Sequence, residues 1–305
     1  MNKDFRRIFC KAIYFLVKLC YNIMRDSKRR SRMTYNEICM ALAGAEIENN
    51  RGEAAMLICH FCGINKAELL TRRDEDFPSD ELEAAVKKRC EHYPLQYILG
   101  FWDFCHETYR VNESTLIPRQ DTEKLVELAV RFMPQGARFI DLCTGSGCVA
   151  ISTLAARPDC RAVAIDLFED TLAVARENAE RNGVGERLGF TARDVLSPDF
   201  MNDLGSFDCI ISNPPYIETE KLSLLDEELS FEPEAALDGG GDGLDFYRAI
   251  IGGCGKQLNE GGIMLFEIGC DQAHAVTAIA HSNGYRCEVY KDFGGNDRVA
   301  YLTRA

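Results

Sequence analysis

The stretch FIDLCTGSG, residues 139–147, decides the fold of this 305-residue chain. Its apolar first half is typical of a buried parallel strand, and its glycines then break the pattern into a turn. The next residues, 148–155 (CVAISTLA), are predicted to form a helix. Glycines let a ligand approach the backbone closely at a helix N-terminus, where N–H groups are free. Residues 139–147 therefore predict a strand, a ligand-binding turn and the start of a helix.

The spacing of these glycines excludes one phosphate-binding motif and disfavours another. Gly145 and Gly147 do not fit Gly-x-Gly-x-x-Gly, which disfavours a dinucleotide site, and no Gly-Lys-Ser/Thr follows, which excludes a P-loop. Nineteen residues after Gly147, Asp166 ends the apolar run 161–165 and is placed to accept from both hydroxyls of a ribose. The alternative for Asp166 is a solvated residue that begins the next helix.

A nucleoside cofactor without a pyrophosphate suits this pattern. S-adenosylmethionine fits, with its ribose at Asp166, its amino-acid end over the glycine-rich turn and its adenine near Asp194 and Val195. The predicted cofactor-binding residues, one of which belongs to the next motif, are Cys143, Thr144, Gly145, Ser146, Gly147, Asp166, Asp194, Val195 and Asn213.

A second motif, NPPY at residues 213–216, follows the apolar run 207–212. Asn213 through its side-chain oxygen and Pro214 through its carbonyl can accept from a planar NH2 group, and Tyr216 offers that group a flat face. The two prolines fix φ and stiffen the turn, so that both acceptors stay aimed. The tetrad favours alkylation of a weakly nucleophilic amide or aromatic amine, whereas a rigid turn is the alternative for the tetrad alone.

From residue 124 onward, helical and strand patterns alternate. Strands are predicted at residues 137–143, 161–166, 187–193, 206–212 and 261–268, and helices at 124–133, 147–156, 169–182, 244–258 and 271–283. This alternation is typical of an α/β fold with a doubly wound parallel sheet. Two late runs, 286–291 and 297–303, predict an antiparallel pair at its edge and bring the strands to seven. Ligands of such sheets bind at the carboxyl ends of the strands. The motif positions expected at that edge are Gly145, Asp166, Asp194 and Asn213.

The chain divides into four predicted parts. Residues 1–32 form a basic extension, 33–92 a small helical bundle for substrate docking, 93–123 a linker with a β-hairpin, and 124–305 an S-adenosylmethionine-dependent methyltransferase domain. Thr34 and Glu37, three residues apart, make a capping box at the start of the bundle.

The basic extension has an apolar helical face that lysines interrupt, so it is too short and too charged to span a bilayer. An amphipathic helix resting on an anionic membrane is one interpretation. The favoured interpretation is a lineage-specific extension, or an upstream start before a true initiator at Met33.

The net charge of −13 is unevenly distributed. Residues 1–32 carry ten Lys/Arg and two Asp/Glu, which leaves 25 Lys/Arg against 46 Asp/Glu, a net of −21, for the rest. A phosphate backbone repels a region of this negative charge. The charge therefore argues against stable nucleic-acid binding and suits a basic protein partner. Residues 218–245 hold ten Asp/Glu against Lys221 alone. A solvated loop accounts for most of these charges, and a rim that steers a basic partner is the functional hypothesis.

Fourteen scattered cysteines indicate a reducing cytoplasm. Cys59 and Cys62 form the only C-x-x-C pair, with no second pair at zinc spacing, so they are predicted on the buried face of a helix and no metal site is expected. Metal binding is the minor alternative for this pair. Cys143 and Cys148 flank the glycine-rich turn without an obvious histidine partner in the sequence, and both are predicted to be packing residues.

Together these motifs resemble those of a known family, the release-factor glutamine methyltransferases. The resemblance covers residues 33–305, and NPPY alone is shared with DNA adenine and other amino-methyltransferases. The combination of blocks is more specific, and it comprises PLQYILG (94–100), LIPRQDTE (116–123), DLCTGSG (141–147), NPPY (213–216), FEPEAAL (231–237) and GDGL (241–244).

The resemblance implies methylation of the side-chain amide of the Gln in the Gly-Gly-Gln loop of peptide-chain release factors, by a monomer. The amide nitrogen would attack the sulfonium methyl in line, without an enzyme nucleophile. The catalytic residues would be Asn213, Pro214 and Tyr216. The substrate-binding residues would be Asn213, Pro214, Pro215, Tyr216 and Arg119.

The chain departs from the family's pattern in three places. Gln120 stands where proline is usual, Val195 stands where an aromatic that stacks on adenine can occur, and the extension has no recognised counterpart.

Two rival functions use the same motifs. A nucleic-acid amino-methyltransferase acting on adenine or guanine also needs a basic recognition surface and base-flipping aromatics, which the charge of −21 argues against. A non-catalytic cofactor-binding scaffold is the second rival, and the intact tetrad and Asp166 argue against it.

Overall fold

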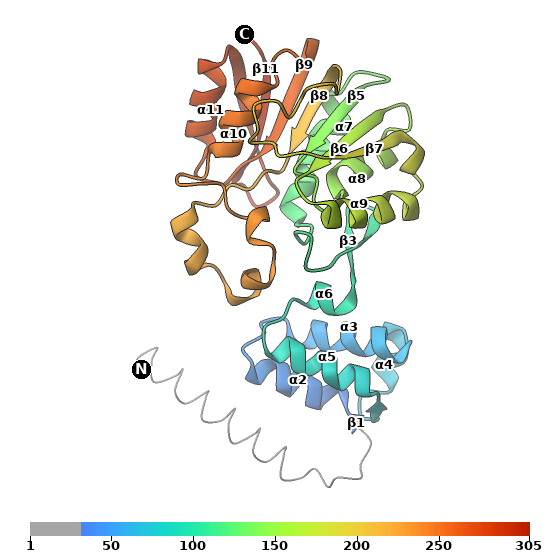
Figure 1. Ribbon diagram of the computed structural model, residues 1–305. Coiled ribbons are helices and arrows are strands. Elements are labelled where there is room, and N and C mark those ends of the chain that lie inside the picture. Colours follow the sequence, from blue (N-terminus) through green and yellow to red (C-terminus); the bar gives the residue numbers. More distant parts are fainter. Residues whose placement is uncertain (1–31) are drawn as a thin grey trace. The chain divides into compact units, whose positions relative to one another are not determined.

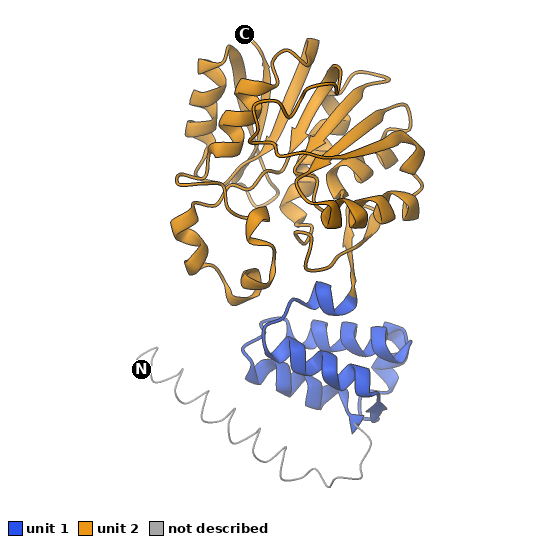
Figure 2. Cartoon of the chain, viewed as in Figure 1, with its two compact units in different colours: residues 1–99 blue, residues 100–305 orange. Residues whose placement is uncertain are grey.

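The computed structural model describes residues 32–305 and separates into two compact units, one ending at Leu99 and one from Gly100 to Ala305 (Figure 2). The basic extension predicted for residues 1–32 lies outside the described residues except for Arg32. Among the described residues, no helix combines the length and the apolar character needed to cross a membrane.

The first unit is helical, as its sequence predicts. The capping box of Thr34 and Glu37 is confirmed, because each side chain bonds the other residue's backbone N–H. The helices pack around one apolar core that includes Ile38, Leu57 and Leu82. Its elements are β1 (Arg32–Met33), α2 (Tyr35–Gly44), α3 (Asn50–Cys62), α4 (Lys66–Thr71), β2 (Phe77–Pro78), α5 (Asp80–Cys90) and α6 (Leu95–Leu99).

Cys59 and Cys62 lie in α3 and pack against the apolar core, as predicted, but both are only half-buried. Leu57 and Ile58 are the fully buried residues of this part of the helix. Residues 32–305 contain no group of three or more His, Cys, Asp or Glu side chains that could hold a metal ion.

The second unit begins with a hairpin and a short 3₁₀ helix. The hairpin's strands, β3 (Phe101–Phe104) and β4 (Glu107–Arg110), pair antiparallel. The 3₁₀ helix η1 (Gln120–Thr122) then leads directly into α7 (Glu123–Phe132).

The second unit is built on a seven-stranded sheet in the order β10-β11-β9-β8-β5-β6-β7 (Figure 1). Neighbours from β9 to β7 pair parallel, whereas β11 pairs antiparallel with both β9 and β10, which confirms the predicted fold and its edge pair. The strands are β5 (Arg138–Leu142), β6 (Arg161–Asp166), β7 (Leu188–Ala192), β8 (Phe207–Ser212), β9 (Leu258–Glu267), β10 (Tyr285–Lys291) and β11 (Asp297–Arg304).

Helices cover both faces of this sheet. Alternate strand residues point to opposite faces, so Phe139 packs with α7, α8 and α9, and Ile140 packs with α10 and α11. These helices, besides α7, are α8 (Cys148–Ala156), α9 (Glu169–Arg181), α10 (Asp245–Gly253) and α11 (Ala273–Ser282). The remaining short 3₁₀ helices are η2 (Gly185–Arg187), η3 (Thr219–Leu224), η4 (Glu227–Phe231) and η5 (Glu234–Ala236).

One boundary differs clearly from the sequence prediction. The helix predicted over 244–258 ends at Gly253, and β9 begins at Leu258 instead of 261. Adjacent glycines weaken the helix at 252–253, whereas the strand accommodates Gly261 at a φ of 73°. The glycine pair at 261–262 reads as a strand boundary in the sequence, which explains the difference.

Buried Asn178 of α9 holds the hairpin and the glycine-rich turn together. Its Oδ1 accepts from the Arg110 N–H at 2.7 Å, and its Nδ2 donates to the carbonyls of Arg110 and Ser146 at 3.0 and 2.9 Å. One side chain therefore satisfies backbone groups of two segments that are far apart in the sequence.

We predict that Asn178→Leu lowers the free energy of unfolding of the protein by roughly 2–4 kcal/mol, because it leaves these backbone groups buried without partners. Urea unfolding measures the loss. The matched control is Asn182→Leu, which removes bonds from a half-buried side chain to the Thr108 and Asn178 carbonyls and should cost less than about 1 kcal/mol. Equal losses in the two variants would contradict the role assigned to Asn178.

Candidate active site

The glycine-rich turn between β5 and α8 is held from within by a buried carboxyl. Asp141 Oδ2 accepts from the Thr144 hydroxyl at 2.6 Å and from the Ala150 N–H at 3.2 Å. Burial raises the pKa of Asp141 to about 7, although both hydrogen bonds favour the charged form. The turn also needs unusual backbone, because Cys143, Gly145 and Gly147 all have positive φ.

Asp166, at the end of β6, lies against this turn. Its Oδ2 accepts from the Gly145 N–H at 2.9 Å, and its Oδ1 accepts from the Phe168 N–H at 3.4 Å. Burial raises its pKa, and the backbone bonds oppose that shift. The structure therefore joins the predicted ribose acceptor directly to the predicted cofactor turn.

The predicted adenine positions lie at the end of the neighbouring strand β7. Asp194 is exposed and its Oδ1 accepts from the Leu196 N–H at 2.9 Å, whereas Val195 is buried in the core. Neither residue lines the pocket that the glycine-rich turn forms.

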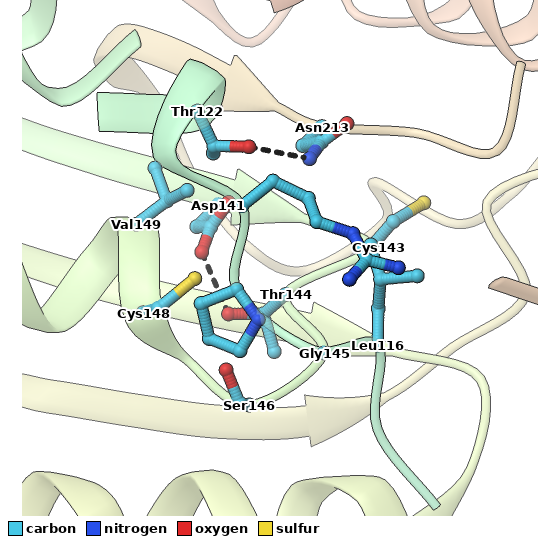
Figure 3. A pocket seen from close by; sticks show the side chains of 12 residues that line it. Leu116, Thr122, Asp141, Cys143, Thr144, Gly145, Ser146, Cys148, Val149 and Asn213 are labelled. Atoms are coloured by element: carbon cyan, nitrogen blue, oxygen red, sulfur yellow. Dashed lines mark hydrogen bonds between the residues drawn. The ribbon is translucent and has the colours of Figure 1, made fainter. Parts of the chain in front are cut away.

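That pocket brings together the two motifs singled out in the sequence, because Asn213 and the glycine-rich turn share its wall (Figure 3). Of the predicted site residues, Arg119, Cys143, Thr144, Gly145, Ser146 and Asn213 line it. Of the predicted site residues, Gly147, Asp166, Asp194, Val195, Pro214, Pro215 and Tyr216 do not. The lining residues that were not predicted are Leu116, Pro118, Thr122, Asp141, Cys148 and Val149.

The NPPY tetrad begins where β8 ends. The Ser212 hydroxyl donates to the Leu142 carbonyl at 2.7 Å, which ties the ends of β8 and β5 together. The Asn213 amide Nδ2 donates to the Thr122 hydroxyl oxygen at 3.3 Å. At the other end of the tetrad, the Tyr216 hydroxyl donates to Glu267 Oε1 at 3.4 Å. Both ends of the tetrad are thus bonded to side chains outside it.

The segment after the tetrad packs back on its last residue. The Gln272 amide nitrogen, Nε2, donates to the Tyr216 carbonyl at 2.9 Å and to the Gly243 carbonyl at 3.2 Å. A Cβ on Gly239 would lie 2.7 Å from Tyr216 Cα, and one on Gly243 would lie 2.4 Å from the Tyr216 carbonyl oxygen. Only glycine fits at these two positions, so the segment closes tightly over the tetrad.

A buried glutamate joins this segment to the block at 116–123. Glu232 forms an ion pair with Arg119 and accepts from the Ile117 N–H at 2.9 Å. The glutamate side chain is 2% exposed and the arginine 38% exposed. Because this pair holds Arg119 at the pocket wall, two blocks that the resemblance had singled out separately form one structural unit.

Glu267 is a buried ionisable residue that sequence analysis missed. It ends β9, the strand next to β8, and burial raises its pKa to about 7, with Thr122, Arg298 and Tyr216 lowering it. A carboxyl-terminal strand position beside β8 was the available signal, because ligand sites lie at that edge.

The two cysteines that flank the glycine-rich turn are not activated, since burial raises the pKa of Cys143 and of Cys148.

This sheet, with its glycine-rich turn after β5 and its NPPY tetrad after the neighbouring strand β8, defines a methyltransferase. Residues 122–244 match the family model described as the methyltransferase small domain, and residues 34–100 match the PrmC N-terminal domain.

Curated relatives identify the family within the methyltransferases. The release factor glutamine methyltransferase of Geobacter sulfurreducens is 39% identical over 265 residues, covering 85% of this chain and 91% of the relative. That of Moorella thermoacetica is 37% identical over 274 residues, covering 88% and 96%. The chain belongs to the release factor glutamine methyltransferase family. A solved structure of the release factor-specific protein-(glutamine-N5) methyltransferase of Alicyclobacillus acidocaldarius is 32% identical, covering 64% of this chain and 99% of that one, with a TM-score of 0.39.

Gly145 and Gly147 allow the turn to be tested at neighbouring positions with different surroundings. A Cβ on Gly147 would lie 2.9 Å from Ile151 Cδ1 and 3.2 Å from Ala175 Cβ, whereas one on Gly145 meets nothing within 4 Å. We predict that Gly147→Ala lowers the free energy of unfolding by about 3 kcal/mol, from overlap and positive φ together. Gly145→Ala should cost about 1–2 kcal/mol, from positive φ alone.

Gly147→Ala should have the larger effect on stability, whereas Gly145→Ala should have the larger effect on ligand affinity. Gly145 lines the pocket, and a methyl group there would meet no protein atom. Calorimetry should therefore show that Gly145→Ala loses more S-adenosylhomocysteine affinity than Gly147→Ala, relative to the stability that each variant loses. A stable Gly147→Ala variant, or full ligand affinity in Gly145→Ala, would contradict this account of the turn.

Proposed function

We propose that this protein transfers the methyl group of S-adenosylmethionine to the side-chain amide nitrogen of the glutamine in the Gly-Gly-Gln motif of peptide-chain release factors. The observation that carries the proposal is the shared pocket of Asn213 and the glycine-rich turn. Family membership supports the reaction, and the orientation of Asn213 supports an amide as the group that is methylated.

The residues around the turn suit S-adenosylmethionine. Ser146 Oγ lines the pocket and is buried without a hydrogen-bond partner in the described part of the chain, and the space beside Gly145 is open. The Ser146 hydroxyl, the backbone of the turn and the Asp166 carboxylate would hold the polar parts of such a nucleoside. The cofactor, when bound, supplies a methyl group already activated by a sulfonium.

The chain's own contribution is to orient the amide. Asn213 donates through Nδ2 to Thr122, which leaves Oδ1 to accept from an incoming NH2 group, and the Pro214 carbonyl would accept its second hydrogen. Holding two reactants in a productive geometry is worth up to roughly 7–11 kcal/mol. Two fixed acceptors also stabilise the positive charge that develops on the nitrogen. Proton loss can follow methyl transfer, so no strong base is required.

The acidic segment 218–245 supports a basic region of a release factor as the partner surface. Part of its charge is internal, because Glu232 is buried against Arg119 and Asp242 pairs with Arg248. Exposed carboxylates remain at Glu220, Asp226 and Glu234. Exposed acidic groups raise the encounter rate with a basic partner and have little effect on contacts once it is bound.

The proposal is tested by incubating the protein and labelled S-adenosylmethionine with a release factor or with RNA and DNA. We predict label in the release factor alone, and none when its Gly-Gly-Gln glutamine is replaced. Asn213→Ala should lower kcat by about 10²–10³-fold, as for loss of an oriented transition-state hydrogen bond, and should keep S-adenosylhomocysteine affinity.

The matched control for this variant is Asn259→Ala. Asn259 donates through Nδ2 to Asp208 Oδ1 at 2.8 Å, at the opposite edge of the sheet. Its kcat should stay within about twofold of the parent protein. Transfer to nucleic acid, or full turnover in Asn213→Ala, would contradict the proposed function.

A further inference from the structure

The hydrogen bond between Asn213 and Thr122 has a definite direction. The amide Nδ2 donates and Thr122 Oγ1 accepts at 3.3 Å, and in Figure 3 the amide oxygen lies on the side turned away from Thr122. A hydroxyl has one hydrogen and two lone pairs. This bond uses a lone pair of Thr122 and leaves its hydrogen for another acceptor.

Glu267 is the candidate for that acceptor. Its side chain is buried, Oε1 accepts from the Tyr216 hydroxyl at 3.4 Å, and Oε2 has no hydrogen-bond partner within residues 32–305. The Thr122 side chain lies near this carboxyl and lowers its pKa, although no hydrogen bond joins Thr122 to Glu267 Oε2 in the structure. Glu267 Oε2 is thus a buried acceptor without a partner among the described residues, and it lies near the Thr122 hydroxyl, whose hydrogen has no acceptor there. A hydrogen bond between the two would satisfy both groups.

The charged side chains near Glu267 act on its carboxyl in opposite directions. Arg298 of β11 stabilises the carboxylate, and Asp121 of η1 opposes it. Arg298 is fixed in place by Asp121 and Asp292, at 3.2 Å from each, and by the Ile268 carbonyl. The Tyr247 hydroxyl of α10 donates to the Glu267 backbone carbonyl at 2.8 Å and holds the end of β9.

We propose that Glu267 and Thr122 are positioning residues that orient the Asn213 amide, so that its oxygen faces the substrate, and thereby select a carboxamide over a carboxylate. This inference rests on the proposed function. In its ionised form Glu267 can only accept, so it takes the Thr122 hydrogen, and Thr122 can then only accept from Asn213. The Asn213 nitrogen is held by Thr122 and its oxygen is left for the substrate.

We call the hydrogen bonds from Asn213 through Thr122 to Glu267 the relay. Without this relay the Asn213 amide group can flip, so that its oxygen and nitrogen exchange places. The Thr122 hydroxyl would then donate to Asn213 Oδ1, and the Asn213 NH2 would face the substrate. Two NH2 groups repel and leave buried donors without acceptors, so a glutamine would bind poorly. A glutamate would bind better, because its carboxylate accepts. The relay therefore controls which of two nearly isosteric side chains the site prefers.

The experiment compares Thr122→Val, Thr122→Ser and Glu267→Gln with the parent protein. Thr153→Val is the matched control, because Thr153 is fully buried in α8 and its hydroxyl has no partner among the described residues. For each protein, kcat and KM are measured with a release factor. The inhibition constant of the same factor, with its Gly-Gly-Gln glutamine replaced by glutamate, gives the amide-to-carboxylate discrimination.

We predict that Thr122→Val lowers kcat about tenfold and the discrimination about tenfold, the effect of one misdirected hydrogen bond. S-adenosylhomocysteine affinity and Tm should match those of Thr153→Val. Thr122→Ser should restore both quantities to within about twofold, because it keeps the hydroxyl. Glu267→Gln, whose amide can donate as well as accept, should lose part of the discrimination.

Unchanged discrimination in Thr122→Val would overturn the inference. So would a loss of discrimination that Thr122→Ser does not restore, or that comes with a fall in Tm beyond that of Thr153→Val. Failure of the parent protein to methylate any release factor would instead overturn the proposed function, and this inference with it.

Discussion

Parallel pairing of β5 with β6 on one side and β8 on the other is the constraint on which the site depends. Registered pairing of Leu142 with Ile165 and with Ser212 makes three strands end together. The residues that follow must then share one edge of the sheet. The glycine-rich turn, Asp166 and Asn213 therefore meet although α8, α9, η2 and β7 lie between them in the chain.

Buried polar groups then turn this shared edge into a defined geometry. Asp141 holds the turn, Glu232 holds the block at 116–123, and Glu267 accepts from the last residue of the NPPY tetrad. Burying each carboxyl costs free energy, as the raised pKa values of Asp141 and Glu267 indicate, and hydrogen bonds offset that cost only with the right partners. Because each buried carboxyl needs particular hydrogen-bond partners, these groups also favour one arrangement of the site over others.

The sequence predicted those features that local pattern encodes. The sheet, the glycine-rich turn and the strand-end positions of Asp166 and Asn213 each follow from residues next to one another in the chain. Thr122, Glu267 and Gln272 were missed because their partners in the tetrad lie 91, 51 and 56 residues away. No local signal shows which buried polar side chains meet. The early end of α10 was missed because the glycine pairs at 252–253 and 261–262 carry opposite meanings, which only packing distinguishes.

The central claim is that a fixed pair of oxygens presents a carboxamide at the pocket edge. A crystal structure of this protein with S-adenosylhomocysteine and a release factor tests it most directly. The account predicts the glutamine amide nitrogen within hydrogen-bonding distance of Asn213 Oδ1 and the Pro214 carbonyl, with Asn213 Nδ2 still on Thr122. A glutamine bound elsewhere, or Asn213 with its oxygen on Thr122, would contradict it.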